Sequence, residues 1–286
     1  MSFDMKRIVF EVKDVSYSCL DKFPALCNVN LEIVEKESIA LMGANGSGKS
    51  SLLHLLNGLA FPQEGEVRFL GQKLTEEALN DEEFNGFFRK TVGLIFQNSE
   101  IQLFSSTVWD EIAFGPTQLG LSKAEVEGRV NDLLKMLNME NLKDRPPYHL
   151  SGGEKKKVAI ASTLAVNPDV LLLDEPTNGL DPRTQAWLIE LLLELRKAGK
   201  TIVIASHDLM VVEKISDRVI VMGEDHRVAG EGKTHEILAD KALLLKVNLI
   251  HDHLHYHDGE LHDHPHGHFS EHDHPHHEEM THTKDR

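Results

Sequence analysis

The sequence is poor in cysteine, with only Cys19 and Cys27 among its 286 residues. Both lie near the N-terminus, and two neighbouring thiols cannot provide the disulfide framework of a small secreted domain. The first residues, MSFDMKRIVFEV, are too polar for a secretory signal and contain no cleavage site. We therefore expect a protein of the reducing cytosol whose two cysteines are free thiols.

Long hydrophobic runs are also missing. Apolar stretches such as VLLL, which begins at Val170, are far shorter than the roughly 20 residues of a membrane-spanning helix. If this protein acts at a membrane, we expect another chain to supply the membrane-spanning part.

Basic residues are fewer than acidic residues. The sequence has 30 Lys and Arg against 46 Asp and Glu, which gives a formal net charge of −16. This charge argues against a general nucleic-acid-binding protein, which needs a basic face. Residues 251–286 hold nine acidic and two basic residues, so this segment contributes −7 and the rest of the chain −9.

The composition is otherwise that of a globular protein, with 41% apolar and 27% charged residues. Residues 7–18 alternate and predict a strand, whereas the unbroken apolar runs at 38–43, 169–175 and 201–206 are typical of parallel strands covered on both faces. Helical spacing dominates from about residue 76 to 165. The sequence therefore predicts an α/β fold with a parallel core sheet and a mostly helical insert.

GANGSGKS, residues 43–50, follows a predicted buried strand and precedes a predicted helix. It fits the phosphate-binding loop pattern, in which backbone N–H groups freed by Gly46 and Gly48 surround a polyphosphate. Lys49 would reach the outer phosphates, and the Ser50 hydroxyl would serve Mg²⁺. The alternative, a chance glycine turn, does not explain the strand before and the helix after it.

Two adjacent carboxylates, Asp174 and Glu175, end the strand that contains VLLL. Neighbours on a strand point to opposite sides, so one carboxylate can serve Mg²⁺ while the other takes a proton from attacking water. The competing interpretation is an acidic strand end that starts a turn at Pro176, and the pair alone does not decide between them.

LSGGEKKKVAIAS, residues 150–162, places a Ser-Gly-Gly turn at the start of a helix. A helix N-terminus is a second site suited to an anion. Ser151 and Glu154 also form an ordinary capping box, although two glycines are more than a cap needs.

Together these motifs resemble the ATP-binding cassette (ABC) ATPases over roughly residues 5–235. The order matches that family: Walker A at 43–50, a Q-loop at Gln97, the signature LSGGE at 150–154, Walker B at 170–174, a D-loop at Asp181 and a switch histidine at His207. The resemblance implies a P-loop nucleotide-binding domain with a mixed β core and a helical signature subdomain.

The resemblance also implies roles that spacing could not assign. Glu175 would be the general base, and His207 would contact the γ-phosphate. ATP would be bound by Tyr17, Gly43, Ala44, Asn45, Gly46, Ser47, Gly48, Lys49, Ser50, Ser51 and Gln97. Mg²⁺ would be held by Ser50, Gln97 and Asp174. The signature residues Ser151, Gly152, Gly153 and Glu154 would act on the ATP of a partner ATPase, and Asp181 would cross that interface.

Local alternatives remain for several of these residues. Asp181 before Pro182 is also a good helix N-cap, His207 alone would usually be structural, and Gln97 alone would be an ordinary loop residue. Glu154 replaces the commoner glutamine of the signature, and KKK replaces a more arginine-rich run, which puts details of the γ-phosphate contact in doubt.

Residues 96–116, FQNSEIQLFSSTVWDEIAFGP, are similar to the energy-coupling-factor (ECF) ATPases, which serve importers of vitamins and transition metals. The resemblance implies membrane-embedded partners, namely a transmembrane subunit and a substrate-binding subunit. It places this chain as a peripheral subunit at the cytoplasmic face of the cell membrane. It also implies an ATPase pair, either a homodimer or a pairing with a second ATPase.

The composition changes abruptly at residue 251, after a nucleotide-binding domain over 1–235 (helical subdomain about 85–165) and a helical extension over 236–250. Residues 251–286 hold too few apolar side chains to fold alone, so we expect a disordered tail. Its candidate ligands for Ni²⁺ or Co²⁺ are the imidazoles of His251, His253, His255, His257, His262, His264, His266, His268, His272, His274, His276 and His277.

Beside an ECF-like ATPase, this tail favours a nickel or cobalt importer. Four alternatives stay open: a vitamin importer with an incidental tail, a soluble ABC ATPase of repair or translation, a metal-storage protein, and a tail that only solubilises. A purification tag is disfavoured, because the histidines alternate with Asp, Glu, Pro, Leu, Tyr and Phe.

Overall fold

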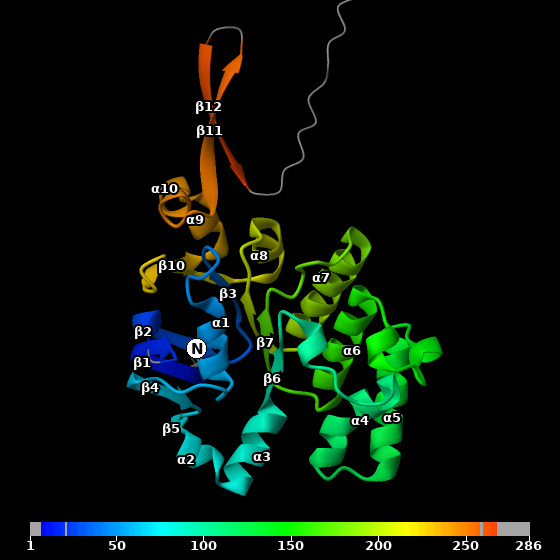
Figure 1. The fold of residues 1–286 in the computed structure, drawn as a ribbon. Helices are drawn as coiled ribbons and strands as arrows, with labels where there is room; N and C mark the ends of the chain where they lie inside the picture. Colours follow the sequence, from blue (N-terminus) through cyan, green and yellow to red (C-terminus); the bar gives the residue numbers. More distant parts are fainter. Residues whose placement is uncertain (1–6, 21, 258–259, 268–286) are drawn as a thin grey trace, which may run out of the picture.

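The computed structural model describes residues 7–20, 22–257 and 260–267. Its centre is a sheet with the strand order β10-β9-β3-β8-β7-β6, in which β10 alone of the described strands runs antiparallel to its neighbour (Figure 1). The strands of this core sheet are β3 (Ser38–Met42), β6 (Val92–Ile95), β7 (Val170–Asp174), β8 (Thr201–Ala205), β9 (Arg218–Met222) and β10 (Val228–Lys233).

The core strands are apolar without alternation because both faces of the sheet are covered. On β7, Val170 and Leu172 pack toward α1 (Lys49–Leu56), whereas Leu171 and Leu173 pack toward α7 (Pro182–Lys197). Every residue of β7 is buried, as the unbroken run VLLL predicts for a parallel strand.

A second, antiparallel sheet lies on the α1 side with the strand order β2-β1-β4-β5. The alternating pattern of residues 7–18 belongs here: Val12 pairs with Leu31 on one neighbouring strand and with Val67 on the other. The strands are β1 (Ile8–Cys19), β2 (Phe23–Val34), β4 (Glu64–Phe69) and β5 (Gln72–Lys73). The β structure is therefore mixed, as expected.

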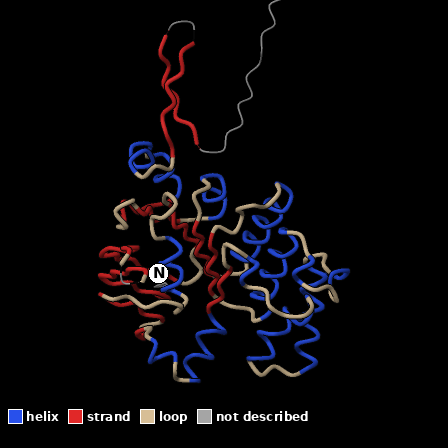
Figure 2. The backbone as a smooth tube through the Cα atoms, in the orientation of Figure 1, coloured by secondary structure: helices blue, strands red, loops and turns tan. Residues whose placement is uncertain are grey.

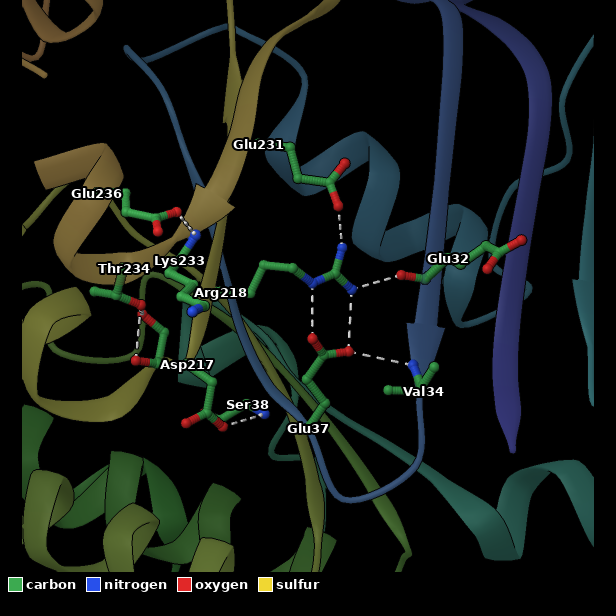
Figure 3. A network of polar contacts seen from close by, with 11 residues as sticks. Glu32, Val34, Glu37, Ser38, Asp217, Arg218, Glu231, Lys233, Thr234 and Glu236 are labelled. Carbon is green, nitrogen blue, oxygen red and sulfur yellow. Dashed lines mark hydrogen bonds and ion pairs between the residues drawn. The ribbon is translucent and has the colours of Figure 1, made fainter. Parts of the chain in front are cut away.

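Arg218 joins the two sheets (Figure 3). Its guanidinium makes two parallel bonds to the Glu37 carboxylate, at 2.7 and 3.0 Å, and donates to the Glu32 carbonyl of β2 at 2.7 Å. A further bond reaches Glu231 on β10. Bidentate arginine–carboxylate geometry fixes orientation as well as distance, so this contact sets how β2 lies against β9.

The helical insert has its own apolar cluster, separate from the sheet. Val130 of α5 packs with Ile112 of α4 and Val158 of α6. Its helices are α4 (Val108–Gln118), α5 (Lys123–Met136) and α6 (Gly152–Ala165), with short 3-10 turns at η1 (Ser99–Ile101), η2 (Glu140–Leu142) and η3 (Pro147–His149). β6 falls inside the range 85–165 predicted for this subdomain, yet it pairs with β7 in the core sheet.

The remaining helices frame the core sheet, and Figure 2 shows helices on both sides of its strands. They are α2 (Glu76–Leu79), α3 (Glu82–Thr91), α8 (Leu209–Ile215), α9 (Thr234–Ala239) and α10 (Lys241–Lys246). No helix in the described part of the chain has the length and apolar character needed to cross a membrane.

The C-terminal segment departs from the prediction of a disordered tail. β11 (Ile250–His257) and β12 (Glu260–Gly267) form an antiparallel hairpin that projects beyond α9 and α10 (Figure 1). The period-two alternation of histidine and the Asp-Gly pair at 258–259 of the sequence favour such a hairpin. The histidines at 268, 272, 274, 276 and 277 lie outside the described residues, so the expectation there stays a prediction.

Candidate nucleotide-binding site

The loop between β3 and α1 requires its glycines. Gly43, Gly46 and Gly48 have φ angles of 153°, 84° and 104°, a region that disfavours side chains. A Cβ on Gly48 would stand 2.1 Å from the Ala25 carbonyl oxygen, so even a methyl group has no room. The loop thus curls directly before α1, where backbone N–H groups and the helix N-terminus can face an anion.

Lys49 is buried inside this curl. Its Nζ donates to the carbonyls of Gly43 at 2.8 Å and Ala44 at 3.0 Å, and lies 3.9 Å from Oε1 of Glu175. Burial lowers the pKa of Lys49, while Glu175 and Asp174 oppose that shift. The carbonyl contacts hold the ammonium at the centre of the loop, where a phosphate could replace them.

The two predicted carboxylates end β7 in different surroundings. Glu175 is 6% exposed, and its φ of 39° is strained for a residue with a side chain. This turn brings Oε1 of Glu175 to 2.9 Å from Nδ1 of His207, which follows β8. The structure therefore brings together Lys49, Glu175 and His207 from three separate elements.

Beside the loop, two of the buried oxygen atoms that lack a hydrogen-bond partner among the described residues are Oγ of Ser47 and Oδ1 of Asp174. Unpaired buried oxygens are costly, and they fit a site that is completed by a ligand. Carboxylate and hydroxyl oxygens are the ligands Mg²⁺ prefers, and the loop N–H groups suit phosphate. The residues present therefore fit ATP with Mg²⁺.

A cleft of about 660 Å³ opens over these groups, within the range of small-molecule sites. The predicted residues Asn45, Gly46, Gly48, Lys49, Ser50, Ser51, Gln97, Glu175 and His207 line it. The sequence reasoning missed Cys19, Phe23, Pro24, Ala25 and Asn178, which complete the lining.

Tyr17 does not lie where the resemblance predicted it. Its ring is partly buried against the core cluster beneath β1 and is not among the side chains lining the cleft. Cys19 and Phe23, which pair across the end of the β1–β2 hairpin, line the cleft instead, and Phe23 is 63% exposed. The register between β1 and β2 is irregular at Tyr17 and Ser18, so strand spacing alone could not reveal this placement.

The signature turn starts α6 with a complete capping box. The backbone N–H of Ser151 donates to Oε2 of Glu154 at 2.8 Å, and Oγ of Ser151 accepts from the Glu154 N–H. Asp181 is the N-cap of α7, because its Oδ1 accepts from the N–H groups of Arg183 and Thr184. The hydrogen bond from Thr184 lowers the pKa of Asp181. The helix-capping roles that the sequence predicts for Ser151 and Asp181 are therefore confirmed.

The signature and the phosphate-binding loop lie at different places on one chain. A Cβ built on Gly153 would lie 3.4 Å from Oγ1 of Thr184 and 3.9 Å from Oδ2 of Asp181, so the signature and D-loop are neighbours. The signature residues do not line the cleft that contains Lys49. Their role across an interface stays a prediction.

The described residues contain no cluster of three or more His, Cys, Asp or Glu side chains that could hold a metal ion. The predicted histidines at 251, 253, 255, 257, 262, 264 and 266 lie on β11 and β12, where only the backbone is described. The tail metal site therefore stays a prediction.

Comparison with known proteins agrees with this geometry. The family model for the ABC transporter matches residues 26–178. The energy-coupling factor transporter ATP-binding protein EcfA of Methanothermobacter thermautotrophicus is 43% identical over 241 residues, which cover 84% of this chain and 76% of that protein. The nickel import ATP-binding protein NikO of Rhodobacter capsulatus is 44% identical over 252 residues, which cover 87% of this chain and 96% of that protein.

Among solved structures, CbiO1 from Clostridium perfringens, described as part of the ABC transporter complex CbiONQ, superposes with a TM-score of 0.71. It is 38% identical, and the match covers 85% of this chain and 96% of CbiO1. With the phosphate-binding loop, the carboxylate–histidine pair and the signature helix all in place, the chain belongs to the ABC transporter ATPases, as the ATP-binding subunit of an importer of the ABC/ECF kind.

Proposed function

We propose that this chain powers the import of nickel or cobalt ions. The observation that carries the proposal is a histidine-rich hairpin that directly follows an ECF-type ATPase. The 44% identity to a nickel import ATP-binding protein supports it. The second candidate is an importer of a vitamin or another micronutrient, favoured by the 43% identity to EcfA, whose name specifies no metal.

In the proposed mechanism, Glu175 takes a proton from the attacking water. His207 lies 2.9 Å from this carboxylate, holds it in place and would contact the γ-phosphate. Lys49 contributes a buried positive charge at the phosphates, where low dielectric strengthens its effect. Ser50, Gln97 and Asp174 would hold Mg²⁺, which neutralises charge on the phosphates when bound.

Pairing with a second ATPase is supported by the separation of the two anion sites, since the signature residues do not line the cleft of their own chain. A signature helix that does not line its own cleft can complete the cleft of a partner, so ATP would bind between two subunits. The partner is a second copy of this chain or a related ATPase.

A membrane-embedded partner is supported by exposed apolar side chains beside the Q-loop. Ile101 is 71% exposed, Phe104 is 67% exposed, and the Phe104 ring packs edge-on against Phe114 with centroids 4.8 Å apart. Exposed apolar clusters mark interaction surfaces. We place the transmembrane subunits of the importer here, which puts this chain at the cytoplasmic face of the membrane.

The backbone register supports metal binding by the hairpin. The pairs His251–His266, His253–His264 and His255–His262 face each other across β11 and β12. Paired residues on an antiparallel ribbon have Cβ atoms about 4.5–5.5 Å apart, which suits two ligands for one ion. Imidazole binds Ni²⁺ and Co²⁺ well, so the hairpin would buffer ions released on the cytoplasmic side.

Co-purification from detergent-solubilised membranes tests the proposal. The full-length chain should bring down transmembrane subunits, and the complex should carry nickel or cobalt by elemental analysis. Recovery of a vitamin-bound membrane subunit without either metal would establish the second candidate instead.

A further inference from the structure

Lys156 is a buried lysine that none of the steps above uses. It lies on α6, two residues beyond the signature, and is 3% exposed. Its Nζ donates to the carbonyls of Phe96 at 3.1 Å and Gln97 at 2.9 Å. The lysine therefore holds the backbone of Gln97, whose side chain lines the nucleotide cleft.

Two further residues of the same loop, Gln102 and Glu100, are tied to α6. Nε2 of Gln102 donates to Oγ1 of Thr163 at 3.2 Å, while its Oε1 accepts from the Phe96 N–H at 3.2 Å. Closer to the signature, Lys155 forms an ion pair of 2.5 Å with Glu100. Residues 96–102 are thus fastened to α6 at three points, and Lys156 is the point that touches Gln97.

A purely structural role would not require a charge here. Burial lowers the pKa of Lys156 to about 8, and the neighbouring charge of Asp174 on β7 only partly offsets this. An apolar side chain of similar length would fill the same space without desolvating an ammonium. What the ammonium adds is several donors on one atom, which can hold two consecutive carbonyls together.

α6 carries the signature at its first residues and Lys156 on its second turn. Lys156 is five positions after Ser151, or about 7.5 Å along a helix, so the two move as one rigid element. A displacement of the signature is then transmitted to the backbone of Gln97.

We propose that Lys156 is a positioning residue that fastens Gln97 to the signature helix, so that the position of this helix sets whether Gln97 is placed for ATP hydrolysis. Lys156 itself is not among the residues that line the nucleotide cleft. This inference rests on ATP hydrolysis in the cleft, the proposed function of the site.

The test is steady-state ATPase kinetics of the full-length chain carrying Lys156→Met. We expect KM for ATP to change less than about twofold, because the cleft is intact, and kcat to fall roughly 10–100-fold, as for a misplaced active-site group. Lys156→Arg, which keeps the charge and donors, should recover much of kcat. Lys157→Met is the matched control, because the Lys157 ammonium lies over the Trp187 ring, 4.9 Å from its centroid.

A double-mutant cycle with Gln97→Ala separates positioning from general damage. If Lys156 acts through Gln97, the Lys156→Met effect should shrink to less than about twofold in the Gln97→Ala background. If the two substitutions instead lower kcat independently, so that their fold-changes multiply in the double variant, the proposal is overturned. An unchanged kcat in Lys156→Met would also overturn it. If Lys156→Met does not fold, Lys156→Gln takes its place in the cycle. Wild-type and Lys157→Met chains that both fail to hydrolyse ATP would instead count against the proposed function.

Discussion

The buried charge of Lys156 should give the protein a measurable pH dependence of stability. In the folded chain its pKa is lowered by burial from 10.5 to about 8. The unfolded chain therefore binds more protons between pH 8 and 10.5, and the contribution of Lys156 to the free energy of unfolding rises with pH in that window. The full difference is about 3 kcal/mol, since one pKa unit corresponds to about 1.4 kcal/mol.

Urea unfolding of wild-type and Lys156→Met chains at a series of pH values measures this contribution. From pH 7 to pH 9.5 the wild-type free energy of unfolding should rise by about 2 kcal/mol relative to the variant. Lys123→Met removes an equal charge from a side chain that is 90% exposed, and should follow the wild type. Parallel curves for wild type and Lys156→Met would refute the argument that the ammonium is held in a desolvated site.

Three further predictions concern the catalytic and binding groups. Glu175→Gln should bind ATP but slow hydrolysis by roughly 10²–10⁴-fold, the usual contribution of a general base; wild-type single-turnover rates would remove it from that role. ATP with Mg²⁺ should dimerise the Glu175→Gln chain in sedimentation, and Ser151→Arg should block dimerisation without abolishing nucleotide binding by the monomer; a monomer at high concentration would point to a different partner ATPase. Truncation after Ile250 should leave basal ATPase activity nearly intact and abolish calorimetric Ni²⁺ binding, which should weaken below about pH 6 as imidazoles protonate; equal Ni²⁺ uptake by both chains would return the segment to a solubilising role.

The sequence by itself determined the elements on which the site is built. These elements are specified by short stretches of sequence: the unbroken run VLLL, the glycines of the loop at 43–50 and the capping residues Ser151 and Asp181. Each of them affects only residues that are close to it in the chain. Backbone freedom, strand burial and helix capping are local physics, so the loop, the parallel core and the starts of α6 and α7 all follow from short patterns. The α/β fold could therefore be predicted before any coordinates.

Only the tertiary structure decided which side chains meet. Strand register places Tyr17 against the core and Phe23 at the cleft, although spacing along β1 gives no sign of it. Lys156 reaches the carbonyl of Gln97, 59 positions earlier in the chain. Histidine content predicted a tail without regular structure, whereas residues 250–257 pair with residues 260–267 as two antiparallel strands. Such contacts depend on how whole elements pack and pair across the chain, and no short pattern of residues contains that information.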